Sequence, residues 1–170
     1  MHHLEDTIRK FAIERHAAAG QRYGMKPYEV HLQAVRQVLA DFGYTGRLLV
    51  AAWAHDLIED TPTTQEELEA IAGPEVAALV WAVTGVGNNR AQRWASVVPK
   101  IAALPEAAIL KLADRIANVE ACTRGKETAL HRMYAREQPA FEASLLGLCD
   151  PQMWARLRAA FADTEASGIS

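Results

Sequence analysis

The sequence has 170 residues, half of them hydrophobic, which is long enough for one domain with a sizeable core. Lys and Arg number 18 against 21 Asp and Glu, and this net charge of -3 argues against a general nucleic-acid-binding protein, so an anionic ligand has to be held by locally placed cations. No apolar run approaches the roughly 18 residues of a membrane span, and the N-terminus "MHHLEDTIRK" lacks the basic-then-apolar order of a signal peptide.

The first part of the chain consists of four segments with helical periodicity. Apolar side chains recur at intervals of three and four in the segments 4–19 and 28–43, which predicts two amphipathic helices. The segment "GRLLVAAWAHDLIED" (46–60) is apolar nearly all round, as is typical of a central helix packed on several sides. The segment 61–73 opens with the helix-start residues Thr and Pro and ends at Gly73.

The rest of the chain continues in the same way, and no alternating pattern of useful length predicts a strand. We therefore predict an all-α fold, built as a single-domain helical bundle. No repeat, low-complexity tract or linker divides the sequence, so the domain is expected to span residues 1–164, with 165–170 as a frayed tail. The remaining predicted helices cover residues 74–85, 89–104, 106–122, 127–148 and 151–164.

The two cysteines, Cys122 and Cys149, lie far apart in the sequence. Neither belongs to a CxxC pair of the kind that binds zinc or carries out redox chemistry. A reduced, cytoplasmic location is the simplest interpretation of this usage.

The stretch "LLVAAWAHDLIEDTPTT" (48–64) places one histidine and three carboxylates within six residues. A helix turns about 100° per residue, so Asp56 is expected to share a face with Glu59 and Asp60. Like charges at this spacing repel one another, and beside an apolar run the repulsion is poorly screened. A positive group is therefore expected near this stretch, and a metal ion would supply it.

Two residues elsewhere in the chain complete a candidate set of metal ligands with His55 and Asp56. His31 lies in the first turns of the second predicted helix, and Asp114 interrupts the apolar helix "AILKLADRIANV". Two imidazoles and two carboxylates suit Mn²⁺ or Fe²⁺ with open positions for water better than a closed structural zinc. An open coordination position is what a catalytic ion requires.

Each of these residues also has a simpler explanation. A single His on a helix is more often packed or exposed than ligating, and Asp114 could pair with Arg115 or Lys111 on its own helix. Glu59 and Asp60 could form the solvated end of a helix. The combination of all these residues is much harder to explain in this way. The other four histidines lack such neighbours and are given no role: His2, His3, His16 and His131.

The order of these residues resembles that of a known family. His31, then "HDLIEDT" at 55–61, then "KLADRIAN" at 111–118 is similar to the HD superfamily of metal-dependent phosphohydrolases. Within it, the match is to the alarmone hydrolase branch, which comprises the hydrolase module of RelA/SpoT proteins and the small alarmone hydrolases. The resemblance covers roughly residues 5 to 148, and the two longer motifs together are specific. It implies an HD-type helical bundle.

The resemblance also implies a role for each residue that matches the motifs. The catalytic role falls on Glu59 and Asp60. The family's substrate-contacting Asn falls on Asn118, one turn after Asp114. The metal role falls on His31, His55, Asp56 and Asp114.

The reaction implied is cleavage of the 3′-pyrophosphate of ppGpp or pppGpp, which releases pyrophosphate and GDP or GTP. One divalent ion, with manganese (Mn²⁺) as the expected cofactor, can lower the pKa of bound water from 15.7 to about 7. Glu59 and Asp60 can accept the proton as a coupled pair, in which the sequence does not identify the base. The expected partner is a small nucleotide, without nucleic acid or membrane. No synthetase domain follows in this sequence, which predicts a hydrolase only.

The loop "GQRYGMKPYEVH" and the helix after residue 89 supply the candidate substrate contacts. Arg22 or Tyr23 could stack on a purine, since both side chains offer flat faces. The loop departs from the family pattern in that Leu32, rather than Pro, follows His31, and this leaves guanine and adenine both open. Arg90 begins a possible basic stripe, with Arg93 and Lys100, that could meet phosphates, although a solvated helix face explains it equally well.

Three alternative functions remain open. The chain could hydrolyse (p)ppApp, or it could be another HD phosphohydrolase such as a nucleoside 5′-monophosphatase, which shares the His-Asp metal set. It could also be a metal-stabilised module that binds nucleotide without turnover. The presence of both Glu59 and Asp60 argues against the last alternative.

Overall fold

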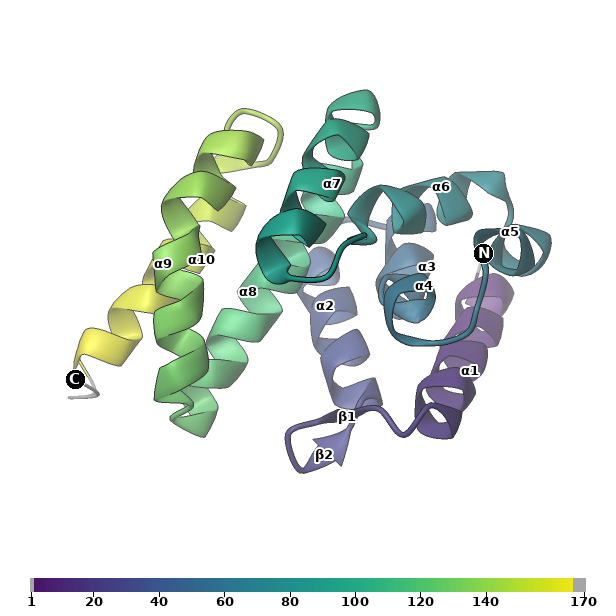
Figure 1. Cartoon of the computed structure of the whole chain (residues 1–170), viewed down its shortest axis with the longest axis horizontal. Helices are drawn as coiled ribbons and strands as arrows, with labels where there is room; N and C mark the ends of the chain where they lie inside the picture. The colour runs from purple at the N-terminus through teal and green to yellow at the C-terminus, as the bar shows by residue number, and fades with distance from the viewer. Residues whose placement is uncertain (1, 167–170) are drawn as a thin grey trace.

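The all-α prediction is confirmed. The structure is a computed structural model that describes residues 2–166, and apart from one short hairpin its elements are helices joined by short loops (Figure 1). The elements are α1 (His2–Ala18), β1 (Arg22–Tyr23), β2 (Lys26–Pro27), α2 (Glu29–Asp41), α3 (Arg47–Ala54), α4 (Leu57–Asp60), α5 (Gln65–Ala72), α6 (Pro74–Val83), α7 (Arg90–Ala103), α8 (Ala107–Gly125), α9 (Thr128–Leu145) and α10 (Pro151–Ala166).

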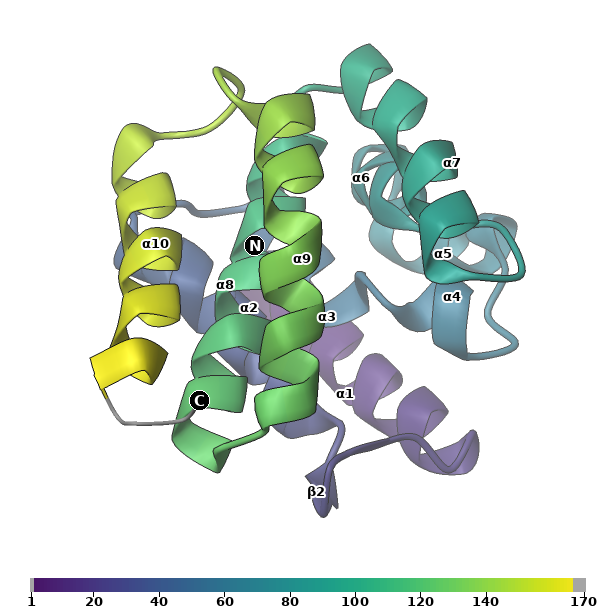
Figure 2. The same cartoon turned by 60° about the vertical axis from the view of Figure 1, so that its left-hand side comes forward.

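Helix α3 forms the centre of the core, as its apolar sequence predicts. All of its side chains from Leu48 to Ala54 are buried, and the helix contacts α1, α2, α6 and α8. Helix α8 is the second central element, because it contacts α2 and α6 on one side and α9 and α10 on the other (Figures 1 and 2). The site described below lies where α2, α3 and α8 come together.

The prediction of one continuous helix over 46–60 is wrong. The chain leaves helical geometry at Asp56, whose φ and ψ are -102° and 0°, so α3 ends at Ala54 and α4 begins at Leu57. Asp56 precedes α4, but its side chain makes no capping hydrogen bond to this helix. Its carboxylate instead lies 3.5 Å from Nε2 of His31 and 2.9 Å from Nε2 of His55.

The hairpin β1–β2 was not predicted from the sequence. Its two strands pair Arg22 with Pro27 and Tyr23 with Lys26. Gly24, at the turn, has a φ of 59°, a left-handed conformation that favours glycine. Strands of two residues are too short to give a periodic pattern, so only the turn residues could have indicated them.

The C-terminal helix reaches further than predicted. Helix α10 continues through Ala166, which includes the first two residues of the predicted tail 165–170. Residues 167–170 lie outside the part of the chain that the structure describes. Within residues 2–166, no helix combines the length and the apolar character that a membrane crossing requires.

Candidate metal centre and active site

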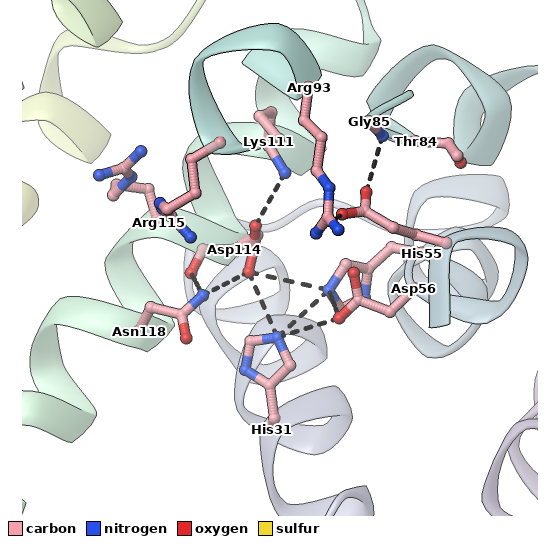
Figure 3. Close-up of polar contacts among 12 residues, drawn as sticks. His31, His55, Asp56, Thr84, Gly85, Arg93, Lys111, Asp114, Arg115 and Asn118 are labelled. Atoms are coloured by element: carbon pink, nitrogen blue, oxygen red, sulfur yellow. Dashed lines mark hydrogen bonds and ion pairs between the residues drawn. The ribbon is translucent and has the colours of Figure 1, made fainter. Parts of the chain in front are cut away.

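Four side chains from three separate parts of the sequence meet at one point, and they are the four predicted ligands (Figure 3). His31 comes from α2, His55 and Asp56 from the junction of α3 and α4, and Asp114 from α8. The Nε2 atoms of His31 and His55 lie 3.2 Å apart. Oδ2 of Asp56 lies 2.9 Å from Nε2 of His55, and Oδ1 of Asp114 lies 3.2 Å from Nε2 of His31.

Both imidazole rings are held in place by neighbouring groups. Nδ1 of His55 lies 2.8 Å from the carbonyl oxygen of Ala52. Since a carbonyl oxygen only accepts, Nδ1 carries the proton, and this leaves the lone pair of Nε2 directed at the cluster. The ring of His31 stacks on the ring of Tyr23, with centroids 4.8 Å apart. Both Nε2 atoms are therefore oriented before any ion binds.

The electrostatics of the cluster favour positive charge at this point. Burial lowers the pKa of His31, but the carboxylates of Asp114 and Asp56 outweigh burial and hold this pKa above its ordinary value. Burial raises the pKa of Asp56, but His55 and His31 outweigh it and hold this pKa well below its usual range. The pKa of Asp114 is also well below its usual range, because Lys111 and the two imidazoles outweigh burial. All three shifts have the same direction, in that the buried carboxylates favour a positive charge between them.

A divalent metal ion fits this donor set. Atoms that ligate one such ion at about 2 Å stand about 3 Å from one another, and the paired donor atoms here are separated by 2.9 to 3.7 Å. His31, His55 and Asp56 form a cluster that can hold a metal ion, and Asp114 adds a fourth donor. Two nitrogen and two oxygen donors leave positions open in an octahedral shell.

Two polar side chains of α8 surround Asp114. Nζ of Lys111 lies 3.2 Å from Oδ2 of Asp114. Nδ2 of Asn118 donates to Oδ1 of Asp114 at 2.6 Å and to its backbone carbonyl at 3.1 Å. Asn118 thus lies one turn after Asp114 on the same face, as the spacing predicts, and its amide nitrogen orients the carboxylate.

The two candidate catalytic carboxylates diverge, because consecutive residues of a helix point about 100° apart. Glu59 faces a cavity in front of the cluster, where the backbone N–H of Gly85 donates to Oε2 at 2.7 Å and Arg93 lies 3.3 Å from Oε1. Asp60 lies behind the cluster, with its Oδ2 3.4 Å from the hydroxyl of Tyr28. Burial, with the nearby charges of Asp56 and Glu59, raises the pKa of Asp60 to about 6.

Gly85 is a steric requirement of this arrangement. A Cβ atom at residue 85 would lie 2.7 Å from Cβ of Arg93 and 3.2 Å from Oε2 of Glu59. Only glycine lets the backbone approach Glu59 closely enough to donate its N–H.

Tyr28 is a site residue that the sequence analysis missed. Its hydroxyl donates to Oδ2 of Asp56 at 2.6 Å. Its ring stacks on His16 with centroids 4.4 Å apart. His16 is almost fully buried, and burial lowers the pKa of this imidazole to about 4, which keeps it neutral. The sequence did contain a signal for Tyr28, because this aromatic residue stands immediately before the helix that carries His31.

Replacing Tyr28 with Phe is expected to weaken Mn²⁺ binding by about tenfold to a hundredfold, because the hydroxyl that orients Asp56 is lost while the ring stays on His16. Isothermal titration calorimetry with Mn²⁺ measures this change. Tyr44→Phe is the matched control, since Tyr44 is a partly buried tyrosine outside the cavity. Equal affinities for the two variants would show that Tyr28 does not support the metal centre.

The cavity in front of the cluster has a volume of about 230 Å³ and is rich in charge. Arg90 and Arg93 from α7 and Lys111 and Arg115 from α8 contribute its cationic walls. The predicted stripe is therefore only partly correct, because Nζ of Lys100 bonds to the carbonyl oxygens of Trp81 and Thr84 instead. Helix α9 also contributes to the cavity, although the sequence analysis assigned it no site residue. These α9 residues are Tyr134 and Glu137.

The structure separates the two candidates for stacking on a purine. Arg22 donates to the carbonyl oxygen of Met25 and does not line the cavity at the metal cluster. The ring of Tyr23 stacks on the ring of His31, and the hydroxyl of Tyr23 donates to Oδ1 of Asn118 at 2.9 Å. That Arg22 contacts the substrate stays a prediction, and in this structure its guanidinium donates within its own loop.

A second cavity of about 450 Å³ lies beside the first and shares Asn118 and Tyr134 with it. It lies between the hairpin and the facing ends of α8 and α9, and its lining includes Cys122. Three exposed apolar side chains surround its opening: Met25, Val30 and Leu130. The two cavities together offer a charged compartment and an apolar compartment joined at Asn118.

Comparison with known proteins places this site in a family context. The family model described as "HD domain" matches residues 9–141. A guanosine-3′,5′-bis(diphosphate) 3′-pyrophosphohydrolase of Aquifex aeolicus is 35% identical over 125 residues, which cover 69% of this chain and 18% of that protein. The bifunctional (p)ppGpp synthase/hydrolase SpoT of Escherichia coli is 31% identical over 128 residues, with shares of 68% and 18%. The chain thus spans about a fifth of the length of these relatives.

Solved structures share the fold. A metazoan ortholog of SpoT, described as hydrolysing ppGpp, superposes with a TM-score of 0.74 at 22% identity and covers 98% of this chain and 97% of that chain. A protein of Listeria monocytogenes gives a TM-score of 0.65 at 19% identity over 79% of this chain and 95% of that chain. At these identities the likeness concerns the fold alone.

Proposed function

This chain belongs to the HD domain family, and from that premise we propose that it is a metal-dependent (p)ppGpp 3′-pyrophosphohydrolase, which releases pyrophosphate and GDP or GTP. The observation that carries the proposal is the convergence of His31, His55, Asp56 and Asp114 at a cavity lined by arginine and lysine side chains. The names of two relatives in sequence support the substrate, because one is a guanosine-3′,5′-bis(diphosphate) 3′-pyrophosphohydrolase and the other a bifunctional (p)ppGpp synthase/hydrolase.

We propose Mn²⁺ as the ion, held by the two Nε2 atoms and one oxygen each of Asp56 and Asp114. When bound, the ion supplies Lewis-acid activation of water and of a phosphate oxygen. The mixed nitrogen and carboxylate donors suit such a catalytic ion better than a structural zinc. Tyr28 and Asn118 keep the two carboxylates oriented toward it.

Glu59 is our candidate for the group that accepts the proton of the attacking water. It lines the cavity, and the Gly85 N–H and Arg93 fix the direction of its carboxylate. The carboxylate of Asp60 contacts the hydroxyl of Tyr28, and the same hydroxyl donates to Asp56. We therefore assign Asp60 a role in positioning this metal ligand. This division of roles gives one carboxylate to proton transfer and the other to the support of a ligand.

The rest of the substrate divides between the two cavities. Lys111, Arg90 and Arg93 offer cations to the phosphate oxygens and stabilise charge on the pyrophosphate as it leaves. The second, more apolar cavity suits the nucleoside, and Asn118 lies between the two compartments. Tyr23 supports this position by holding the amide of Asn118.

The proposal is tested by incubating the Mn²⁺-loaded protein with ppGpp and identifying the products. GDP and pyrophosphate are expected, while GDP, GTP and nucleoside monophosphates stay intact. Cleavage of ppApp without cleavage of ppGpp would retain the reaction class but change the base. Release of orthophosphate from a 5′-monophosphate, with both 3′-pyrophosphates untouched, would instead identify a nucleoside 5′-monophosphatase.

We also propose that the partner is this small nucleotide alone, without nucleic acid, and that the protein works in the cytoplasm. The net charge of -3 and the placement of these cations around one cavity of about 230 Å³ support the first point. Cys122 and Cys149 are both free thiols, which supports a reduced compartment.

A further inference from the structure

Glu137 of α9 holds two arginines of the charged cavity at once. Its Oε1 lies 2.7 Å from Nε of Arg90, and its Oε2 lies 3.0 Å from Nη2 of both Arg90 and Arg115. Arg90 is the first residue of α7, whereas Arg115 belongs to α8. The carboxylate therefore links α9 to α7 across the cavity that these helices flank (Figures 1 and 2).

The two guanidinium groups have other support besides Glu137. The guanidinium of Arg115 lies 4.7 Å from the ring centroid of Tyr134 and 4.4 Å from that of Phe141, and the residue is 8% exposed. The guanidinium of Arg90 lies 5.5 Å from the ring centroid of Tyr134. Aromatic faces thus hold both cations in place, and the main contribution of Glu137 is its negative charge.

The donors of Arg115 are incompletely used. Its Nη1 is buried and has no hydrogen-bond partner among the described residues. A buried guanidinium donor without an acceptor is costly, and an anionic oxygen would satisfy it. Arg90 is the more accessible of the two arginines, because its side chain is 54% exposed.

Glu137 differs from the other carboxylates of the cavity. Asp56 and Asp114 are candidate metal ligands, and Glu59 accepts from the backbone of Gly85. Among the described residues, the carboxylate of Glu137 bonds only to the guanidinium groups of Arg90 and Arg115. Burial raises its pKa, but Arg90 and Arg115 outweigh burial and keep this pKa below its usual range, so the group is ionised at neutral pH. An ionised carboxylate thus occupies the position that a phosphate group would take on these arginines.

We infer that Arg90 and Arg115 form an anion subsite for a diphosphate group and that Glu137 is its built-in counter-ion, which the diphosphate displaces from Arg90 on binding. Glu137 then weakens the binding of diphosphates and promotes their release. The inference deepens the proposed function, since the diphosphate can be the second one of the substrate or free pyrophosphate. It concerns binding alone and requires no bond cleavage.

The test measures the binding of inorganic pyrophosphate and of GDP to the Mn²⁺-loaded protein, with Mn²⁺ in fixed excess. Glu137→Gln removes the charge but keeps an oxygen that can accept from Arg115. This variant is expected to bind pyrophosphate about tenfold more tightly than the unmodified protein, with a steeper loss of affinity as salt is added. A gain for GDP as well would assign the subsite to a nucleoside-linked diphosphate, and a gain for pyrophosphate alone would assign it to the free anion.

Glu142→Gln is the matched control, because Glu142 lies on the same helix and pairs with Arg158 outside the cavity. It should leave both affinities unchanged, and adding Arg90→Gln to Glu137→Gln should remove the gain. Equal or weaker pyrophosphate binding by Glu137→Gln would overturn the inference and leave Glu137 as a residue that only orients the arginines.

A second measurement follows binding in the unmodified protein, and a variant serves only to assign the signal. The ¹⁵N resonance of the Arg90 Nε, identified as the signal that Arg90→Gln removes, is expected to shift when pyrophosphate saturates the protein. A signal that stays in place at saturation would also overturn the inference. Turnover of ppGpp enters neither measurement, so a failure here is distinct from a failure of the proposed function.

Discussion

Replacing His55 with Ala is expected to abolish both metal binding and hydrolysis of ppGpp. The Nε2 atom of His55 lies 3.2 Å from that of His31 and 2.9 Å from Oδ2 of Asp56, so its loss removes a central donor. The remaining carboxylates would also lose a partner that keeps them ionised. Metal content after dialysis, measured by inductively coupled plasma mass spectrometry, and product formation from ppGpp are the two readouts.

His3→Ala is the control for the loss of an imidazole, because His3 is exposed at the start of α1. It should keep one ion per chain and normal turnover. Circular dichroism of both variants separates loss of the ion from loss of the fold. Stoichiometric metal in a folded His55→Ala protein would refute the assignment of this residue as a ligand.

Replacing Glu59 with Gln is expected to keep the ion but lower kcat by about a hundredfold to ten-thousandfold, the range that general acid–base catalysis contributes. The amide keeps the size of the side chain but no longer accepts a proton from water. Asp60→Asn should also keep the ion, because the Tyr28 hydroxyl still donates to Asp56, and it should reduce turnover less than Glu59→Gln because Asp60 does not line the cavity. Metal content and steady-state kinetics with ppGpp distinguish these effects from loss of ligation.

Gly85→Ala provides an independent check of the orientation of Glu59. The added Cβ would lie 2.7 Å from Cβ of Arg93, so the contact that fixes Glu59 has to open. Turnover should fall while the metal content stays unchanged. If Glu59→Gln turns over at nearly the normal rate, the proton is transferred to another group.

The helices were predictable because the signals that define them are local. Apolar spacing of three and four residues marks a buried helix face, and Gly73 and Pro74 mark the junction of α5 and α6. The apolar segment that became α3 was correctly predicted as a central element, and all of its residues from 48 to 54 are buried. The break at Asp56 was not predictable in this way, since it depends on where the carboxylate points.

The candidate metal ligands could also be chosen from the sequence, because their chemistry is unusual in its surroundings. His55, Asp56 and Asp114 are polar residues inside apolar helical segments, and the motifs around them match a known pattern. In the structure, Nε2 of each of the two histidines, His31 and His55, lies 2.9 to 3.7 Å from an oxygen of each carboxylate. Ion binding by these residues is a prediction, and the His55→Ala variant tests it.

The sequence by itself determined the helical class, most helix boundaries and the residue types at the metal cluster, because each of these follows from neighbours along the chain. Only the tertiary structure decided which further residues hold the ligands and the cavity side chains in place. Tyr23 meets Asn118 across 95 positions of sequence and Arg90 meets Glu137 across 47. Helix periodicity carries no information on such pairs, since their contact depends on how α7, α8, α9 and the hairpin pack in space.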